Sequence, residues 1–548
     1  FRSIEVMATN PEAFDRLVKS DALDAFASSL AEQDCWFGSL NGCHSFNAAT
    51  ARIDERIGTY RSFHQFNIEL PARIHDTKTN IGEPIARVEE VMKETGLISD
   101  DTPMFVRIDQ VERLYRSDVL RQALGVQYRR VINKALSKRD SRVSYRIGTR
   151  PYAWDDDLTI FGTADKLEHI RDYRIVDLDE KLRRKEDRTT WLFPEFATDT
   201  FRRRLRHGGI TPAATRDDSL KQVFGETPKP EQVAGDYARN SSADKILRLG
   251  PDWPMAWTSF LEALFQTDPF TAGLAGAWAR QRGQSGKRGV RLQSAPPVQQ
   301  APWNKSTWRK ERVRQCLMQI AARCAQRLRW SGKETILSLS TPNISVFLSV
   351  CHEIWDAFLR AERGKTPAKR VDPLRETIDR DVQSVGIETA SKDWYTKIAE
   401  LPNGHDRQRF VDVLGRKFRK GLLDDVEMSY PGYNGFSLAV EELDSVPVLA
   451  RFLCDATDYG DLYSVEHTTK GADRRRRVKW YLSPILSAYF QIPDAHTKEP
   501  YYTTAAEVLQ WLNEAKVCLD GIAPITADSR AASQEESSED TRQLRLGF

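Results

Sequence analysis

The order of apolar and polar residues predicts short strands that alternate with amphipathic helices over the first 200 residues. The apolar run Met104 to Ile108 lies between Pro103 and Asp109, and its length and composition are typical of a strand buried on both faces. The same reading predicts further strands at 63–70, 142–147 and 173–178, and helices at 13–30, 48–61, 81–95, 117–137 and 194–205. Strands and helices at this spacing indicate βαβ units and a parallel sheet.

The pattern changes after residue 208. From Gly208 to Pro302 the chain is loose, with Gly, Pro, Gln and basic residues dominating from Ala279 onward, so we expect a flexible basic insertion near 208–302. Helical spacing resumes at 306–329 and 336–360, where Asn343 or Ser345 can cap a helix. Later come helices at 406–423 and 443–457, a strand at 461–465, a basic turn and a returning strand. This order predicts a winged helix.

Composition narrows the class of protein. The 548 residues carry a net charge of only +3, and no run approaches the roughly 18 apolar residues of a membrane span, so we expect a soluble protein without a membrane partner. The seven cysteines are odd in number and show no CxxC spacing, which argues against a disulfide framework and a zinc site and fits a reducing cytoplasm. The chain begins FRSIEV, without a methionine or secretory leader, and we expect that start to be a cut.

Asp109 is the first candidate for chemistry. Open α/β sheets bind ligands outside the carboxyl ends of their strands, and a carboxylate there can hold Mg²⁺ beside nucleotide phosphates. The alternative is an ordinary buried strand followed by an acidic helix start, since acids favour the positive end of the helix dipole.

The turn between the last two predicted strands is a candidate for DNA binding. Lysine and arginine side chains there would neutralise phosphates, a sequence-independent source of affinity. The residues are Lys470, Arg474, Arg475, Arg476, Arg477 and Lys479. Trp480, Tyr481 and Tyr489 interleave this cluster with rings, although the rings could equally be core and the hairpin merely solvated.

Four segments together resemble the bacterial ATPases related to the origin-recognition and Cdc family of AAA+ proteins, close also to the STAND ATPases. They are FVRIDQVERL (105–114), YRIGTRPYAW (145–154), NISVFLSVCHEIWDAF (343–358) and RRVKWYLSPILSAYFQIP (476–493). The resemblance reaches to about residue 519. It implies an α/β fold with a parallel-sheet P-loop ATPase core, a helical lid, a C-terminal winged helix, and ATP with Mg²⁺ as cofactors. We therefore expect a truncated core at 1–190, a lid at 191–365, a winged-helix domain at 372–519 and a disordered acidic tail at 524–548.

The resemblance also implies residue roles. Asp109 corresponds to the Walker B aspartate that holds Mg²⁺. Thr149 and Arg150 correspond to the polar sensor of the γ-phosphate. The lid arginine that contacts the nucleotide corresponds to the cluster with Arg202, Arg203 and Arg206. The alternatives are a turn residue before Pro151 for Arg150, and a solvated helix face for the cluster.

Two departures limit the expected activity. No Walker A pattern is present: GQSGKRG (283–289) has the wrong spacing and SGKET (331–335) lacks the first glycine. We expect that loop upstream of Phe1 and poor ATP binding by the chain as printed. Gln110 stands where the family usually has a glutamate, and glutamine can orient a water but cannot accept its proton, so hydrolysis should be slow; Glu112 is a possible substitute.

The C-terminal tail ends in a short pattern of its own. Residues 524–542 are polar and acidic, which predicts disorder, yet the chain finishes QLRLGF. This ending resembles the bacterial sliding-clamp-binding peptide, with Gln543 and the apolar Leu544, Leu546 and Phe548 as its contacts. The alternative is that these side chains fold back onto the domain.

We expect a bacterial, nucleotide-controlled and DNA-associated ATPase switch, in replication, mobile-element biology or antiphage defence. Its expected partners are DNA, a sliding clamp as a further candidate, and proteins or other copies of itself. The alternative is a catalytically degenerate scaffold with an ATPase fold that recruits DNA or protein partners. A nuclease or transposase would need several metal-binding carboxylates, and the sequence offers only Asp109.

Overall fold

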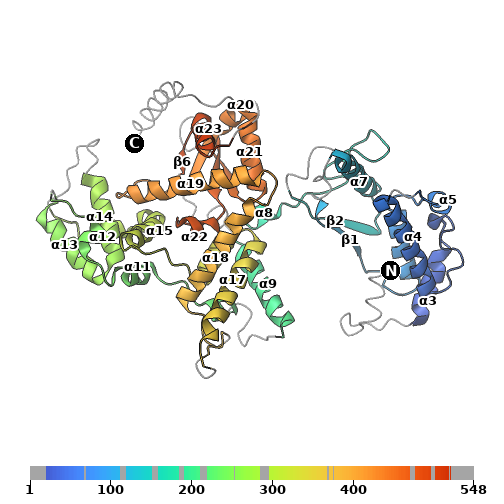
Figure 1. Cartoon of the computed structure of the whole chain (residues 1–548), viewed down its shortest axis with the longest axis horizontal. Coiled ribbons are helices and arrows are strands. Elements are labelled where there is room, and N and C mark those ends of the chain that lie inside the picture. Colours follow the sequence, from blue (N-terminus) through green and yellow to red (C-terminus); the bar gives the residue numbers. More distant parts are fainter. Residues whose placement is uncertain are drawn as a thin grey trace. The chain divides into compact units, whose positions relative to one another are not determined.

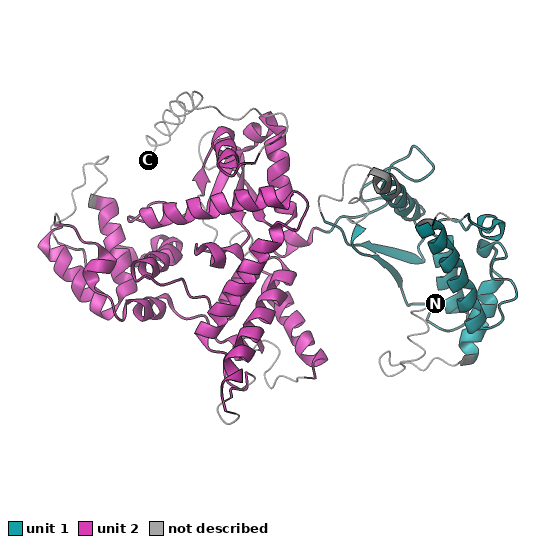
Figure 2. Ribbon diagram, viewed as in Figure 1, with its two compact units in different colours: residues 1–176 teal, residues 177–548 magenta. Residues whose placement is uncertain are grey.

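The protein is helix-rich, with one small parallel sheet and one mixed sheet (Figure 1). The computed structural model describes residues 20–66, 69–111, 119–150, 158–183, 191–209, 219–251, 253–283, 295–366, 370–373, 375–468, 475–494, 500–517 and 519. The chain divides into two compact units, 1–176 and 177–548, and we describe each by itself (Figure 2). Within the described ranges, no helix combines the length and the apolar character that a membrane span requires.

Unit 1 is built on two parallel strands. β1 (Met104–Ile108) pairs in register with β2 (Val143–Ile147), and α7 (Val119–Ser137) lies between them in the chain. This confirms the predicted βαβ unit. The remaining elements are α3 (Ser20–Ala31), η1 (Asp34–Trp36), α4 (Phe46–Phe66), α5 (Ala72–His75) and α6 (Glu83–Glu94). Apolar residues of α3, α4 and α6, with Phe26, Leu30 and Val91 fully buried, form the core of this unit.

β1 is buried on one face only, so the prediction of burial on both faces is wrong. Its residues alternate between partly buried and exposed, and Phe105 remains 42% exposed. A two-stranded sheet has too little width for a second covering layer. The outer face is instead covered in part by the Arg146 guanidinium, whose carbon lies 4.0 Å from the centroid of the Phe105 ring.

Two other predicted strands are absent. The segment 63–70 begins as the last turn of α4, and 173–178 contributes only an isolated bridge from Tyr173 to His169 before α8 (Leu178–Lys181) begins. Apolar alternation was present in both segments, but neither meets a neighbouring strand in the described part of the chain. Ile175, Val176 and Leu178 are consequently more than half exposed.

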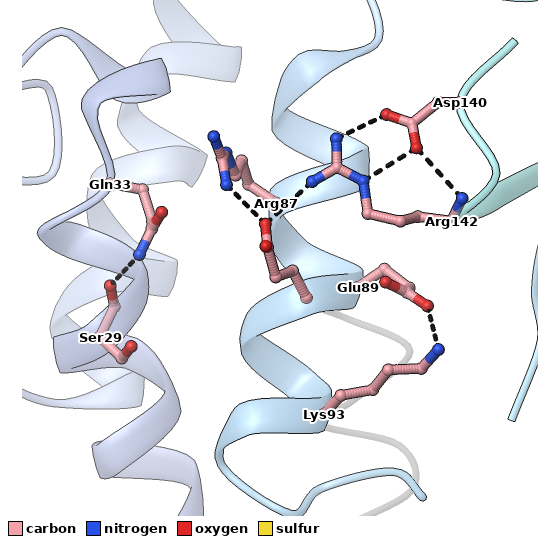
Figure 3. Close-up of polar contacts among 8 residues, drawn as sticks. Ser29, Gln33, Arg87, Glu89, Lys93, Asp140 and Arg142 are labelled. Atoms are coloured by element: carbon pink, nitrogen blue, oxygen red, sulfur yellow. Dashed lines mark hydrogen bonds and ion pairs between the residues drawn. The ribbon is translucent and has the colours of Figure 1, made fainter. Parts of the chain in front are cut away.

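Ion pairs attach α6 to the start of β2 (Figure 3). Arg142 Nη1 lies 2.9 Å from Glu90 Oε2, and the same carboxylate oxygen lies 2.6 Å from Arg87 Nη1. Arg142 also donates from Nε and Nη2 to Asp140, at 2.8 and 2.7 Å. Hydrogen bonding by Arg142 lowers the pKa of the Asp140 carboxyl. These contacts fix where β2 begins relative to the helix that packs beside it.

Unit 2 begins with a helical part. Its elements are α9 (Phe193–His207), α10 (Ser219–Phe224), α11 (Pro230–Ala238), α12 (Ala243–Leu247), α13 (Met255–Thr267), α14 (Pro269–Gly283), η4 (Pro302–Asn304), α15 (Ser306–Arg323), α16 (Lys333–Ser340), α17 (Ile344–Arg363), α18 (Arg380–Ile398) and α19 (Gly404–Asp424). Asn343 caps α17 as predicted, accepting from the backbone N–H groups of Ser345 and Val346.

The prediction of a flexible insertion at 208–302 is wrong for most of that range. α11 to α14 pack with α15 around a core of their own, in which Trp257 and Trp303 are almost completely buried. The rings of Trp257 and Trp303 meet edge to face with centroids 6.1 Å apart. Gly, Pro and Arg content suggested a loose segment, but the widely spaced tryptophans supply enough apolar area for a folded module.

The C-terminal part of unit 2 contains β3 (Gly435–Ala439), α20 (Val440–Ser445), α21 (Pro447–Asp458), β4 (Leu462–Thr468), β5 (Arg476–Leu482), α22 (Leu486–Phe490), β6 (Tyr501–Tyr502) and α23 (Ala505–Glu514). The sheet order is β4-β5-β3-β6, with β5 antiparallel to both β4 and β3. The predicted hairpin is therefore confirmed. Phe436, Leu438, Trp480 and Leu482 lie in the core of this unit.

Side chains of α15 cap the C-terminus of α19. The last carbonyls of a helix have no partner within it and need donors from elsewhere when buried. Gln319 Nε2 donates to Leu422 O and Asp425 O at 2.9 and 2.8 Å, and Gln315 Nε2 donates to Leu422 O at 3.1 Å. Both glutamines are about 1% exposed. Buried polar contacts thus join α15, which packs in the tryptophan core, to α19, which packs in the second core of this unit.

We expect Gln319→Leu to lower the free energy of unfolding by about 2 kcal/mol, because the variant removes two short hydrogen bonds to buried carbonyls and leaves them only the longer bonds from Gln315. Urea denaturation of the purified chain measures the change. Gln326→Leu is the matched control, since Gln326 is exposed and makes a single longer bond of 3.3 Å. If both variants lose the same free energy of unfolding, the hydrogen bonds from Gln319 to the end of α19 have no special role in stability.

An acidic group at the end of α21 gives a pH dependence. Burial, and then the nearby Asp455 and Asp179, raise the pKa of Asp458 to about 6. The folded state therefore retains a proton that the unfolded chain loses near pH 4, so this group lowers stability as pH rises from about 4 to 6. We expect Asp458→Asn to raise the free energy of unfolding at pH 7.5 by about 1 kcal/mol, a value reduced for the solvent reaching this half-buried carboxylate. Urea denaturation at pH 7.5 and 4.5 checks it. If Asp458→Asn differs from the wild-type chain in free energy of unfolding by the same amount at both pH values, the raised pKa of Asp458 is contradicted.

Candidate functional site

Asp109 lies at the carboxyl end of β1, next to the backbone that leaves β2. The N–H of Gly148 donates to Ile108 O at 2.8 Å. A Cβ at position 148 would lie 3.0 Å from Asp109 Oδ1, so glycine leaves space for the carboxylate. Asp109 is exposed, so its carboxylate can reach solvent and ligands.

The chain turns sharply after Asp109. Gln110 has a φ of 59°, in the left-handed region, and its N–H donates to Asp109 Oδ1 at 2.8 Å. The strand therefore does not continue through Gln110, and Val111, 5% exposed, anchors the chain one residue later. The predicted substitute base Glu112 lies outside the described residues.

The structure brings the predicted sensor residues to the same edge as Asp109. Ile108 and Ile147 are register partners, so Asp109 follows one strand where Gly148, Thr149 and Arg150 follow the other. Thr149 is half-buried and Arg150 is exposed. The Thr149 hydroxyl donates to Arg150 O at 3.3 Å.

The donor set at this edge fits one kind of metal site. In the described parts of the chain, no three His, Cys, Asp or Glu side chains converge to hold a metal ion. One exposed carboxylate beside a hydroxyl suits Mg²⁺, which keeps several waters and takes further ligands from substrate phosphates. It does not suit a zinc site, which needs about four protein ligands when structural.

A sizeable cavity lies elsewhere in unit 1. It measures about 630 Å³ and lies between α4 and α6, with Trp36, Ile57, Tyr60 and Ile85 among its walls. None of the residues at the ends of β1 and β2 lines it. Its lining contains hydroxyl groups and the cations Arg56 and Lys78 but no carboxylate, so a carboxylate is what distinguishes the strand ends from this cavity.

The predicted lid arginines lie on α9 in unit 2. Arg202 and Arg203 both form ion pairs with Asp199, the second at 2.7 Å. The hydrogen bond from Arg203 is the main cause of the lowered pKa of the Asp199 carboxyl. Arg206 is exposed. These contacts fit a solvated helix face, and the nucleotide role remains a prediction because Asp109 belongs to the other unit.

The described arginines of the β4–β5 hairpin have different surroundings. Lys470 and Arg474 lie outside the described residues. Arg475 is exposed, and Arg476, with its side chain 70% exposed, lies 3.6 Å from Glu466. Both can reach a phosphate.

Arg477 is held by the sheet. Its Nη2 donates to Ser437 O at 2.7 Å and to Thr503 O at 3.1 Å, and its guanidinium carbon lies 5.0 Å from the centroid of the Tyr502 ring. Lys479, on the same face, is half-buried between its register partners Val465 and Ser437. We expect both side chains to contribute less to phosphate binding than Arg475 and Arg476.

Ser437, His467 and Arg477 form a polar cluster on this face of the sheet, which the sequence did not indicate. Ser437 Oγ lies 3.1 Å from His467 Nε2 and accepts from Arg477 Nε at 3.1 Å. Burial, with Lys479 and Arg477, lowers the pKa of His467 to about 4, so the ring is neutral at pH 7. A neutral ring can share one hydrogen bond with the Ser437 hydroxyl at Nε2, with the donor set by the tautomer of the ring. This cluster ties β3, β4 and β5 together.

The rings near the hairpin belong to the interior. Trp480 and Tyr481 are 4% and 3% exposed, and Tyr489 stacks on Tyr395 with centroids 4.4 Å apart. This confirms the alternative in which the rings are core. The clamp-like residues Gln543, Leu544, Leu546 and Phe548 lie outside the described residues.

A basic turn on α19 was not expected from the sequence. The exposed residues Arg416, Lys417, Arg419 and Lys420 fall within one turn and a half. The segment RKFRK was visible in a helix that had been predicted, and its helical spacing leaves only Phe418 on the apolar face.

Comparison with known proteins identifies the family. The model of the ORC-CDC6-like family matches residues 21–499. Searches of curated proteins and of solved structures found no match. The matched range includes Asp109, Thr149 and the strands β3, β4 and β5, and an AAA+-type fold agrees with the small parallel sheet and its strand-end carboxylate. Since the match covers most of its length, the chain belongs to the ORC-CDC6-like family, which is related to nucleotide-binding AAA+ ATPases.

Proposed function

We propose that this chain is a nucleotide-controlled, DNA-associated ATPase that binds Mg²⁺ and ATP phosphates at the carboxyl ends of β1 and β2. One observation carries the proposal: Asp109 lies against Gly148, so a carboxylate, a hydroxyl and a guanidinium follow two paired parallel strands at one edge. Ligands of open α/β sheets bind at this edge. Membership of the ORC-CDC6-like family supports the same class of ligand.

Each residue has a distinct part in this proposal. Asp109 holds Mg²⁺, whose charge would neutralise the phosphate oxygens. Thr149 and Arg150 contact the terminal phosphate, the arginine through charge-assisted hydrogen bonds. Gln110 is placed beside Asp109 and can orient a water by hydrogen bonding, but an amide cannot take up its proton. Hydrolysis should therefore be slow, as suits a switch in which bound nucleotide holds one arrangement of lid and DNA-binding domain.

We also propose that residues 404–482 form a winged helix. Its support is the element order α19, β3, α20, α21, β4, β5 together with the strand order β4-β5-β3. Arg475 and Arg476 would contact DNA phosphates beside the hairpin turn. A bacterial setting in replication, mobile-element biology or defence, and a clamp-binding role for Gln543 to Phe548, belong to the same proposal and rest on the sequence pattern.

The second candidate is a scaffold with an ATPase fold that recruits partners without turnover. Gln110 in place of a general base and the missing Walker A pattern in the printed chain favour it. In that case nucleotide would still bind at Asp109 or not at all, but phosphate release would stay at background. The two candidates therefore differ in turnover.

We expect Mg·ATP to bind the chain weakly, with a Kd of about 1 mM, and Asp109→Asn to weaken binding about tenfold, because the variant removes the carboxylate that holds the metal. Isothermal calorimetry with and without Mg²⁺ measures this. Asp101→Asn is the matched control, an exposed acid that precedes β1. If Asp109→Asn binds Mg·ATP as tightly as the wild-type chain does, the strand-end site is not the nucleotide site.

We expect Arg475→Glu/Arg476→Glu to lower affinity for duplex DNA about tenfold or more and to reduce the dependence of log Kd on log salt by about two, because two phosphate contacts are lost. Fluorescence anisotropy at several salt concentrations provides both values. Lys392→Glu/Lys397→Glu, an exposed pair on α18, makes the same charge change elsewhere. If both double variants lose the same affinity for duplex DNA, binding depends on net charge alone and the hairpin arginines are not a specific contact.

A further inference from the structure

We propose that the C-terminal turn of α19, together with Tyr430, binds single-stranded DNA. This surface lies apart from the hairpin arginines and goes beyond the duplex contact proposed above, although it rests on the same general association with DNA. Four exposed cations, Arg416, Lys417, Arg419 and Lys420, lie beside an exposed tyrosine whose ring begins a row of aromatic contacts.

The helix that a winged helix would place in a DNA groove is poorly suited to that task. α20 and α21 expose Glu441 and Asp444, and Asp455 and Asp458 lie half-buried on α21, whereas Arg451 is the one basic residue of the two helices. Burial raises the pKa of Asp455, and burial with neighbouring acids raises that of Asp458 to about 6. Such a surface repels phosphates, so strong nucleic-acid contacts must lie elsewhere on this unit.

The basic turn of α19 has the opposite charge. Arg416 is paired with Asp412 at 2.9 Å, but its side chain is still 78% exposed. Arg419 and Lys420 are exposed, and no ion pair engages either of them within the described residues. Of the nearby acids, Asp424 is exposed, whereas Asp425 accepts from the N–H groups of Ser429 and Tyr430. The turn therefore presents more cations than acids to solvent.

Two tyrosine rings pack near Gly421, the residue that follows these cations in α19. A Cβ at Gly421 would lie 3.6 Å from the Tyr433 ring, so that ring packs onto α19 next to Lys420. Tyr430, 53% exposed, lies with its ring centroid 5.4 Å from that of Tyr433. On the same helix, Lys417 Nζ lies 5.0 Å above the buried Trp511 ring. A flat exposed ring with another ring behind it is fixed in orientation before any ligand binds.

This combination selects the chemical class of ligand. Lysine and arginine neutralise the backbone phosphates of either duplex or single strands, but an exposed ring can stack only on a base that is not already stacked in a duplex. Stacking on one ring is worth about 1–3 kcal/mol per base, and it depends little on sequence. We therefore assign single-stranded DNA, with phosphates at Arg419 and Lys420 and a base on Tyr430.

Two variants of the full chain test this assignment, with fluorescence anisotropy of a labelled single strand of about 20 nucleotides and of the same sequence as a duplex. We expect Arg419→Glu/Lys420→Glu to weaken single-strand binding about tenfold or more and to lower its salt dependence by about one to two. We expect Tyr430→Ala to weaken single-strand binding about fivefold and to leave duplex binding unchanged. Arg419, Lys420 and Tyr430 are exposed, so their replacement should not unfold the chain. We expect both variants to keep the urea midpoint of the wild-type chain, which would show that they are folded.

Two control variants separate this surface from others. Lys392→Glu/Lys397→Glu changes the same charge on α18 and should leave single-strand affinity within twofold of the wild-type value. Arg475→Glu/Arg476→Glu should lose duplex affinity and keep single-strand affinity, so failure of the hairpin proposal can be told apart from failure of this one.

Three results would overturn the inference. One is wild-type single-strand affinity in both Arg419→Glu/Lys420→Glu and Tyr430→Ala, which would leave the surface to a protein partner. Another is an equal loss in the α18 control. The third is an equal loss of affinity for duplex and for single-stranded DNA in Tyr430→Ala. A base can stack on the Tyr430 ring only when it is not already stacked in a duplex, so the variant should weaken single-strand binding alone.

Discussion

Helix α19 holds the larger unit together, because both of its ends depend on side chains from other elements. Near its start, Arg407 Nε lies 2.5 Å from Asp461 Oδ2, and both side chains are almost completely buried. The guanidinium carbon also lies 4.0 Å from the centroid of the Tyr459 ring. At its other end, Gln315 and Gln319 of α15 supply the donors for its last carbonyls. Removing one partner of a buried ion pair typically costs about 3–5 kcal/mol, so neither end tolerates simple truncation. The position of α19 in turn determines where the basic turn and Tyr430 face solvent.

A different constraint shapes unit 1. Parallel strands in register end at the same edge, so whatever follows β1 and β2 is brought together by pairing alone. Gly148 leaves space for the Asp109 carboxylate, and the left-handed Gln110 turns the chain away from the strand. Within the described residues, few other contacts hold this edge. This edge is therefore small and open. Such an edge suits the proposed ligand, Mg²⁺ with nucleotide, because the phosphates and bound waters would provide most of the ligands of the metal.

The sequence predicted the features that depend on local pattern. β1, β2, α7 and the β4–β5 hairpin follow from apolar spacing, and Asp109 from its place after an apolar run. The sequence could not show how wide the sheet is, which is why Phe105 was expected to be buried and 173–178 to be a strand. It also could not show that tryptophans spread over 253–303 meet in one core, or that Arg477 is engaged by Ser437 and Thr503. Those outcomes depend on contacts between residues that are distant in the chain.

The central claim is that nucleotide binds where β1 and β2 end. Hydrogen exchange with millimolar ATP, compared with and without Mg²⁺, tests it directly, because it reports on backbone N–H groups along the whole chain. We expect Mg²⁺-dependent protection in peptides that cover 104–111 and 143–150. Protection at the cavity between α4 and α6 instead, or no Mg²⁺-dependent protection at either strand end, would contradict it.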